Sequence, residues 1–161
     1  MGFFAWRLDA VDLVELYDLQ AAYLTSALER AGRSQLMSLD CNGERLGVAA
    51  IPHEGAPPVA RLEAVLAMLV TEARSAALVR AHGLLADRLA PSRHAERAVL
   101  SDTAGELSAL ERAAVMSDRP AILQVLADYH RRRTRQAPQI VAAMRASAVG
   151  QCMQSKSEAA A

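Results

Sequence analysis

The segment from Leu8 to Gly32 constrains the fold most, because it has the sequence signals of a long amphipathic helix: a capping residue at its start, an apolar face and a glycine at its end. Asp9 suits the N-cap position, where a carboxylate accepts hydrogen bonds from free backbone N–H groups. Gly32 stands where a left-handed residue would end the helix. Apolar side chains recur on one face at spacings of three and four residues. They are Leu13, Leu16, Tyr17, Leu24, Ala27 and Leu28. The segment therefore predicts a helix that packs this face against other elements.

Gln20 is a polar residue on the same apolar face. A buried amide costs stability unless its donors and its acceptor find partners. Two interpretations follow from this position. Gln20 either forms hydrogen bonds to a neighbouring helix, as most buried amides do, or points into a polar pocket.

Composition narrows the class of protein. With 161 residues, 52% of them apolar, and a formal net charge of zero, the chain fits one folded domain. It resembles neither a disordered protein nor a strongly basic nucleic-acid binder. The aromatic content of 4% and the many alanines and leucines favour helix over sheet. There is no signal-peptide pattern and no apolar run long enough to cross a bilayer, so a cytoplasmic protein is expected without a membrane partner.

Helix start signals recur along the rest of the chain. Pro58 suits the first turn of a second helix. A short helix is expected from Arg93 to Leu100, and Asp102 is an N-cap candidate for the helix that follows. The stretch from Ser117 to Pro120 combines an N-cap candidate with a first-turn proline, and so predicts the start of the last helix.

Helix breakers divide these segments. Gly83 predicts a break or kink, Pro91 the end of a helix, and Pro138 a kink or break in the last helix. Residues 36–58 hold an Asn-Gly pair between short apolar runs, which fits a hairpin or a helix stub followed by a loop. The chain is thus predicted to be all-α, an antiparallel bundle of five to seven helices in residues 1–150. Residues 151–161 are predicted to be a flexible tail.

Local motifs for catalysis or metal binding are missing from the sequence. The four histidines, His53, His82, His94 and His130, show no metal-ligand spacing. No P-loop, glycine-rich dinucleotide motif or nucleophile elbow occurs. The sequence therefore predicts neither a metal site nor a cofactor, and it does not predict an enzyme.

The densest charge is the run from His130 to Arg135. From Arg119 to Ala148 the chain holds six arginines and one acid, whereas Met1 to Arg30 holds five acids and two arginines. The run could contact a phosphate or an acidic ligand. It could also be a solvated face, or lie against the acidic first helix, and this second interpretation is favoured because the run lacks interleaved aromatic residues.

Two stretches resemble a known family. D-L-V-E-L-Y-D-L-Q, residues 12–20, resembles the opening helix of the FadR C-terminal (FCD) domain of bacterial GntR-family transcription regulators, and residues 2–5 resemble the linker before it. L-S-A-L-E-R-A-A-V-M-S-D-R-P-A-I, residues 107–122, resembles a later motif of that domain. The resemblance implies a dimeric helical bundle that binds a small effector, usually a carboxylate or fatty-acyl-like metabolite.

Many members of that family hold a metal with an aspartate and three histidines. The matching positions here are Leu69, Ala73, Leu107 and Tyr129, so a metal-free site is expected. The family also places a winged helix-turn-helix domain before the FCD domain, and only about eight residues precede the first helix here. DNA binding is therefore expected only through a winged-helix domain outside this chain. The chain itself is expected to be either an excised sensor domain or a stand-alone relative of such domains.

The resulting hypothesis is a non-enzymatic effector-binding and dimerisation domain of a GntR-like transcription regulator. It would bind a small organic metabolite, expected to be a carboxylate, in a metal-free pocket lined by Tyr17, Gln20, Tyr129 and His130. Two alternatives stay open. One is a helical interaction protein without a pocket, and the other is a small enzyme that uses Tyr129 and His130 for acid–base chemistry.

Overall fold

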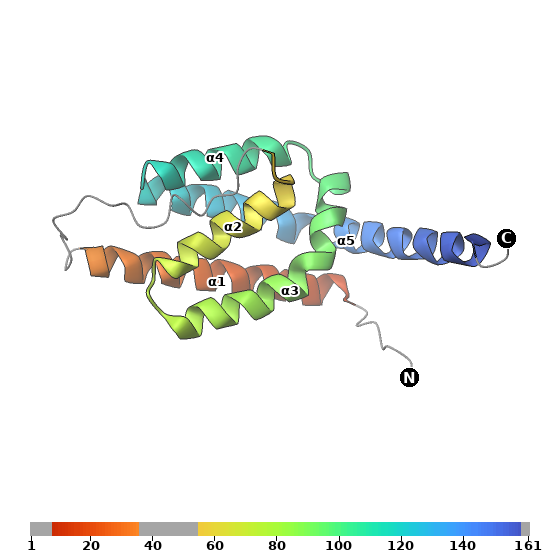
Figure 1. Ribbon diagram of the computed structural model, residues 1–161, viewed down its shortest axis with the longest axis horizontal. Helices are drawn as coiled ribbons and strands as arrows, with labels where there is room; N and C mark the ends of the chain where they lie inside the picture. Colours follow the sequence, from red (N-terminus) through yellow and green to blue (C-terminus); the bar gives the residue numbers. More distant parts are fainter. Residues whose placement is uncertain (1–7, 36–54, 159–161) are drawn as a thin grey trace.

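The computed structural model describes residues 8–35 and 55–158, which form five α-helices. The helices are α1 (Ala10–Gln35), α2 (Pro58–Thr71), α3 (Ala76–Val99), α4 (Thr103–Val115) and α5 (Arg119–Glu158). Helix α5 packs against α1, α3 and α4 and extends beyond the other four helices at its C-terminal end (Figure 1). The described part of the chain contains no strand. The prediction of an all-α bundle of five to seven helices is confirmed.

Three of the helices begin at an aspartate, as the sequence predicted. Through Oδ1, Asp9, Asp102 and Asp118 each accept a backbone N–H three residues further on, at 2.9, 3.1 and 3.1 Å. Each bond satisfies one of the N–H groups that a helix leaves free in its first turn. Helix α2 begins at Pro58, where the missing N–H costs nothing. Four of the five described helix starts were thus predicted, whereas the start of α3 at Ala76, capped by Ser75, was not.

The helices continue at four places where the sequence suggested an end, a break or a kink. Helix α1 continues through Gly32 to Gln35, and α3 continues through Gly83. An isolated glycine costs a helix only about 1 kcal/mol, which packing against neighbouring helices readily outweighs. Helix α5 is not broken at Pro138, and it ends at Glu158 instead of near Gly150.

Pro91 does not end a helix but lies inside α3, so the short helix expected from Arg93 to Leu100 is the second half of α3. Figure 1 shows that α3 turns sharply between its two halves. A proline inside a helix removes one hydrogen bond, and its ring presses on the preceding turn, which bends the helix. The bend turns the second half of α3 across the bundle.

Two apolar clusters make up the core. One joins parts of α1, α2, α4 and α5 and includes Leu24, Leu66, Leu110 and Leu126. The other joins α1, α3 and α5 around a different set of side chains. This set includes Leu13, Tyr17, Leu89, Ala137 and Ile140. The predicted apolar face of α1 is confirmed, since all six of its apolar residues are buried.

A polar layer separates the two clusters. On α1, Gln20 lies between Tyr17 of one cluster and Leu24 of the other. On α5, the polar-layer residues Tyr129 and Arg133 lie between Leu126 of the first cluster and Ala137 of the second. We define the polar layer as the buried residues Gln20, Arg93, Glu96, Tyr129 and Arg133. The bundle is therefore not uniformly apolar inside.

The hairpin or helix stub expected within residues 36–58 lies mostly outside the described residues. Within residues 8–35 and 55–158, the helices are too short or too polar to span a bilayer.

Candidate functional site

Arg93 is the centre of the polar layer. Its Nε donates to Oε1 of Glu63 at 2.6 Å, and its Nη1 donates to Oε1 of Glu96 at 2.8 Å. Nη1 also donates to the hydroxyl of Tyr129 at 2.6 Å, and Nη2 donates to Oε1 of Gln20 at 3.2 Å. One guanidinium therefore connects α1, α2, α3 and α5. Five N–H groups in a planar fork suit arginine to this position better than lysine.

Arg133 is the second buried cation. Its Nε donates to Oε2 of Glu96 at 2.8 Å, and its Nη1 lies 2.9 Å from Oε2 of Glu106 on α4. Its guanidinium carbon lies 3.4 Å from the centroid of the Tyr129 ring, a stacking contact that favours a cation. The Arg93 and Arg133 contacts together connect all five helices.

Glu96 is shared between the two arginines, and the hydroxyl of Tyr17 also donates to its Oε1 at 2.7 Å. Burial pushes the pKa of Glu96 upward, but Arg93 and Arg133 outweigh burial and hold this pKa below its usual value. Both oxygens of a buried, ionised carboxylate are thus partnered. Such a charge is tolerated in a core only with this degree of pairing.

The two tyrosines of the site stay neutral. Burial, reinforced by the charge of Glu96, raises the pKa of Tyr17 well above its ordinary value. Burial raises the pKa of Tyr129 to about 12, although Arg93 and Arg133 act in the opposite direction. Both hydroxyls therefore act as hydrogen-bond donors or acceptors near neutral pH, and not as bases.

His130 is buried beside this network. Its Nδ1 lies 2.7 Å from the carbonyl oxygen of Leu126, and its ring meets the edge of Tyr129 at a centroid distance of 4.8 Å. Burial lowers the pKa of His130 to about 4, so the ring is neutral at pH 7. Its Nε2, like Nε2 of Gln20, has no hydrogen-bond partner among the described residues.

The four residues expected to line a ligand pocket are all buried, with at most 5% of each exposed. Tyr17, Gln20 and Tyr129 are brought together, but around the Arg93–Glu96 pair. Of the two interpretations of Gln20, the structure shows the hydrogen bond to a neighbouring helix, with Arg93 of α3 as its donor. His130 adjoins Tyr129.

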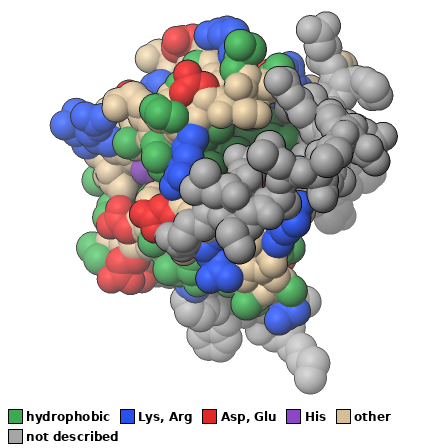
Figure 2. All heavy atoms as spheres, turned by 90° about the vertical axis from the view of Figure 1, so that its left-hand side faces the viewer, with side chains coloured by type: hydrophobic (Ala, Val, Ile, Leu, Met, Phe, Trp, Pro, Cys, Tyr) green, Lys and Arg blue, Asp and Glu red, His purple; other side chains and the backbone are tan. Residues whose placement is uncertain are grey.

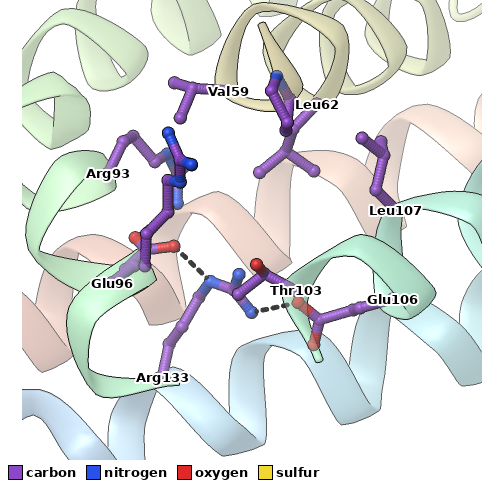
Figure 3. Close-up of a pocket in the computed structure, with 10 residues that line it drawn as sticks. Val59, Leu62, Arg93, Glu96, Thr103, Glu106, Leu107 and Arg133 are labelled. Carbon is purple, nitrogen blue, oxygen red and sulfur yellow. Dashed lines mark hydrogen bonds and ion pairs between the residues drawn. The ribbon is translucent and has the colours of Figure 1, made fainter. Parts of the chain in front are cut away.

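A pocket opens next to the polar layer, between α2, α3, α4 and α5. Figure 3 shows Val59 and Leu62 above it, Arg93 and Glu96 on one side, Thr103, Glu106 and Leu107 on the other, and Arg133 below. Pro58 and Arg97 complete the lining. Its volume of about 30 Å³ holds about two water-sized groups. None of the four residues expected from the sequence belongs to this lining.

The pocket combines an apolar wall with a charged floor. The wall is formed by α2 and by Leu107 of α4, and the floor is formed by Arg93, Glu96 and Arg133. Apolar lining with a few fixed polar groups is typical of sites for small molecules, because the apolar part supplies affinity and the polar groups fix orientation. The arrangement suits a small amphipathic ligand.

Sequence reasoning missed Arg93, Glu96 and Arg133. A signal for the first two was present, because they continue the helical stripe of Leu85 and Leu89 at spacings of four and three residues. Charged residues on an apolar stripe are rare unless they are paired inside the protein. Arg133 gave a similar signal, since it follows Tyr129 by one helical turn.

The basic run from His130 to Arg135 does not form one solvated face. Arg131 is exposed and pairs with Asp128, whereas Arg132 is half-buried beside Glu106. Arg133 is buried. On the face shown in Figure 2, acidic and basic side chains are interspersed with apolar ones. The run is therefore divided, because Arg132 and Arg133 pair with carboxylates of neighbouring helices, whereas Arg131 pairs within α5.

The four positions that the family resemblance associates with metal binding, Leu69, Ala73, Leu107 and Tyr129, are buried in the bundle. Within the described ranges, no three His, Cys, Asp or Glu side chains are placed to hold a metal ion.

Comparisons with family models, with curated proteins and with solved structures gave no match to this chain.

Proposed function

We propose that this chain is a non-enzymatic effector-binding domain that takes a small organic anion, such as a carboxylate, into the pocket between α2, α3, α4 and α5. The single observation that carries the proposal is the position of the pocket against two fully buried arginines. Buried guanidinium groups held in place by carboxylates form a rigid floor, which needs no reorganisation when a ligand arrives. The resemblance of residues 12–20 and 107–122 to FCD domains supports the same role.

The contacts of the floor explain how a bound ligand would affect the rest of the domain. Arg93 contacts side chains of α1, α2, α3 and α5, and Arg133 contacts α3 and α4. A ligand that prefers one arrangement of these ion pairs would shift the positions of several helices together. This is the behaviour required of a sensor domain.

Methyl-resolved NMR tests the proposal. The full chain is titrated with a panel of small metabolites, and the signals of Leu62 and Leu107 report binding in the pocket. The variant Val59→Phe fills the pocket, while Val11→Phe places the same ring on an exposed valine of α1 and serves as a control. We expect at least one organic acid to shift the pocket signals in the wild type and in the control but not in Val59→Phe. Binding that Val59→Phe leaves unchanged would contradict the proposal.

The same resemblance supports a homodimer, with DNA contacted only through a winged-helix domain outside this chain. Sedimentation equilibrium of the chain measures its mass directly. A dimer is expected at micromolar concentration, and a monomer at every concentration tested would refute this part of the proposal.

A second candidate function is a helical interaction protein. Exposed apolar side chains favour it, namely Val11 on α1, Leu84 on α3 and Met116 directly after α4. The NMR titration discriminates the two functions, since an interaction protein would show no ligand-induced shifts at Leu62 and Leu107.

A further inference from the structure

Most of the positive charge around the pocket is already neutralised. Arg93 is paired with Glu63 and Glu96, and Arg133 with Glu96 and Glu106. These five residues alone carry one more negative than positive charge. A negatively charged ligand would therefore be repelled unless another cation stood at the pocket.

Arg97 is that cation. It follows Arg93 by one helical turn in the last turn of α3, and it lines the pocket. Its side chain is exposed and forms no ion pair or hydrogen bond with another side chain in the described ranges. Among the arginines of the lining, Arg93 and Arg133 have fixed carboxylate partners, so Arg97 is the one whose charge a ligand can use.

We infer that Arg97 is the specificity-determining residue of the pocket and selects a singly charged, short organic anion. This inference rests on the proposed function. Arg97 pairs with the ligand's charge, and the apolar part of the ligand lies against Leu62 and Leu107. Arginine suits this task because its planar fork holds a carboxylate through two parallel bonds.

The surroundings of Arg97 exclude other ligand classes. A neutral analogue of the same shape gains nothing from the charge of Arg97. A second negative charge on the ligand would have to lie beside Glu96 or Glu106, where like charges repel. The volume of about 30 Å³ favours an apolar part of only two or three carbons.

Three probes with the same three-carbon skeleton test the inference: propionate, propionamide and malonate, titrated at constant ionic strength with methyl NMR as the readout. The variants are Arg97→Gln, Arg97→Lys and, as a control, Arg112→Gln. Arg112 is an exposed arginine in the last turn of α4, outside the pocket lining. Because Arg97 is exposed, its replacement leaves the core intact.

In the wild type we expect propionate to bind about tenfold more tightly than propionamide or malonate, as one charge-assisted bond would give. Arg97→Gln should abolish this preference, Arg97→Lys should retain part of it, and Arg112→Gln should leave it unchanged. A preference that survives in Arg97→Gln overturns the inference, as does tighter binding of malonate.

Failure of the inference differs from failure of the proposed function. If ligands shift the signals of Leu62 and Leu107 but Arg97→Gln does not change the ratio of propionate to propionamide affinity, the pocket stands and only the role of Arg97 is refuted. If neither these probes nor the metabolite panel shifts the pocket signals, both are refuted.

Discussion

Glu96 shows why a buried charge persists in this core. The carboxylate pairs with two arginines and also accepts hydrogen bonds from the hydroxyls of Tyr17 and Ser92. Removing the charge would leave two guanidinium groups in an apolar environment with fewer partners. Loss of one member of a buried ion-pair network is therefore more costly than loss of an exposed pair.

We expect the isosteric variant Glu96→Gln to lower the free energy of unfolding by about 3–5 kcal/mol, because Arg93 and Arg133 lose the carboxylate that they share. Urea denaturation followed by circular dichroism measures the loss. Asp128→Asn is the matched control, since its pair with Arg131 lies half-exposed on the surface. The control should cost less than about 1 kcal/mol. Equal losses in the two variants would show that the network does not act as a unit.

The buried His130 makes the free energy of unfolding depend on pH. Its pKa is about 4 in the folded protein and 6.5 ordinarily. Between these values the unfolded chain takes up a proton that the folded protein does not, so stability falls as the pH is lowered. One group contributes at most about 1.4 kcal/mol per pH unit. We expect His130→Gln to flatten the stability profile between pH 6.5 and 4, as measured by urea unfolding at several pH values, and a profile as steep as that of the wild type would contradict this role of His130.

At the residue scale, the sequence predicted the apolar faces but not the internal partners. The buried stripe of α1 could be predicted because helical periodicity depends on neighbours within one turn. The partners of Arg93 lie 30 residues before it on α2, 36 residues after it on α5, and 73 residues before it on α1. No local pattern encodes such contacts. Gln20 was identified as a buried amide, yet its donor could not be predicted.

At the element scale, helix starts were predicted better than helix ends. A start depends on a side chain that bonds to its own backbone, such as Asp102. An end depends on whether packing against other helices stabilises one more helical turn, and this packing depends on the tertiary structure. Gly32, Gly83 and Pro91 weaken a helix locally, but in each case the helix continues. The bend at Pro91 even serves the site, since Arg93, Glu96 and Arg97 all lie just beyond it.

Substitutions of the N-cap residue Asp102 separate two local contributions to a helix start, the capping hydrogen bond and the backbone conformation. Asp102 accepts the N–H of Gly105 at 3.1 Å, and its φ of 55° lies in the left-handed region. Asp102→Ala should cost about 1–2 kcal/mol, because it removes the cap and places an alanine at a positive φ. Asp102→Gly also removes the cap but tolerates this φ, so it should cost only a few tenths of a kcal/mol. Thermal and urea unfolding compare the two variants, and equal losses would contradict a role for backbone conformation.

For the whole molecule, the polar layer divides the core into two apolar clusters. Replacing a buried ion network with apolar residues of similar volume is often neutral or stabilising by about 1–4 kcal/mol. The presence of the ion-pair network is therefore better explained by the groups that it holds in place than by a gain in the free energy of unfolding. What it positions here is the floor of the pocket.

If the network is kept for the pocket, we can predict the result of replacing its two arginines and their shared carboxylate together. The triple variant Arg93→Met, Glu96→Leu and Arg133→Met removes both cations and their shared carboxylate while keeping side-chain volumes similar. Glu63 and Glu106 each lose one cation, but Glu63 is partly exposed and Glu106 keeps its pair with Arg132. The free energy of unfolding of the triple variant should therefore be higher than that of Glu96→Gln, which leaves both arginines in the core without their shared carboxylate. The triple variant should also lose propionate binding although Arg97 is retained, because Glu106 lines the pocket without Arg133 and repels the carboxylate. Urea denaturation and methyl NMR measure the two properties separately. A triple variant less stable than Glu96→Gln would show that the network is kept for stability, and one that still binds propionate would show that the buried arginines do not form the site.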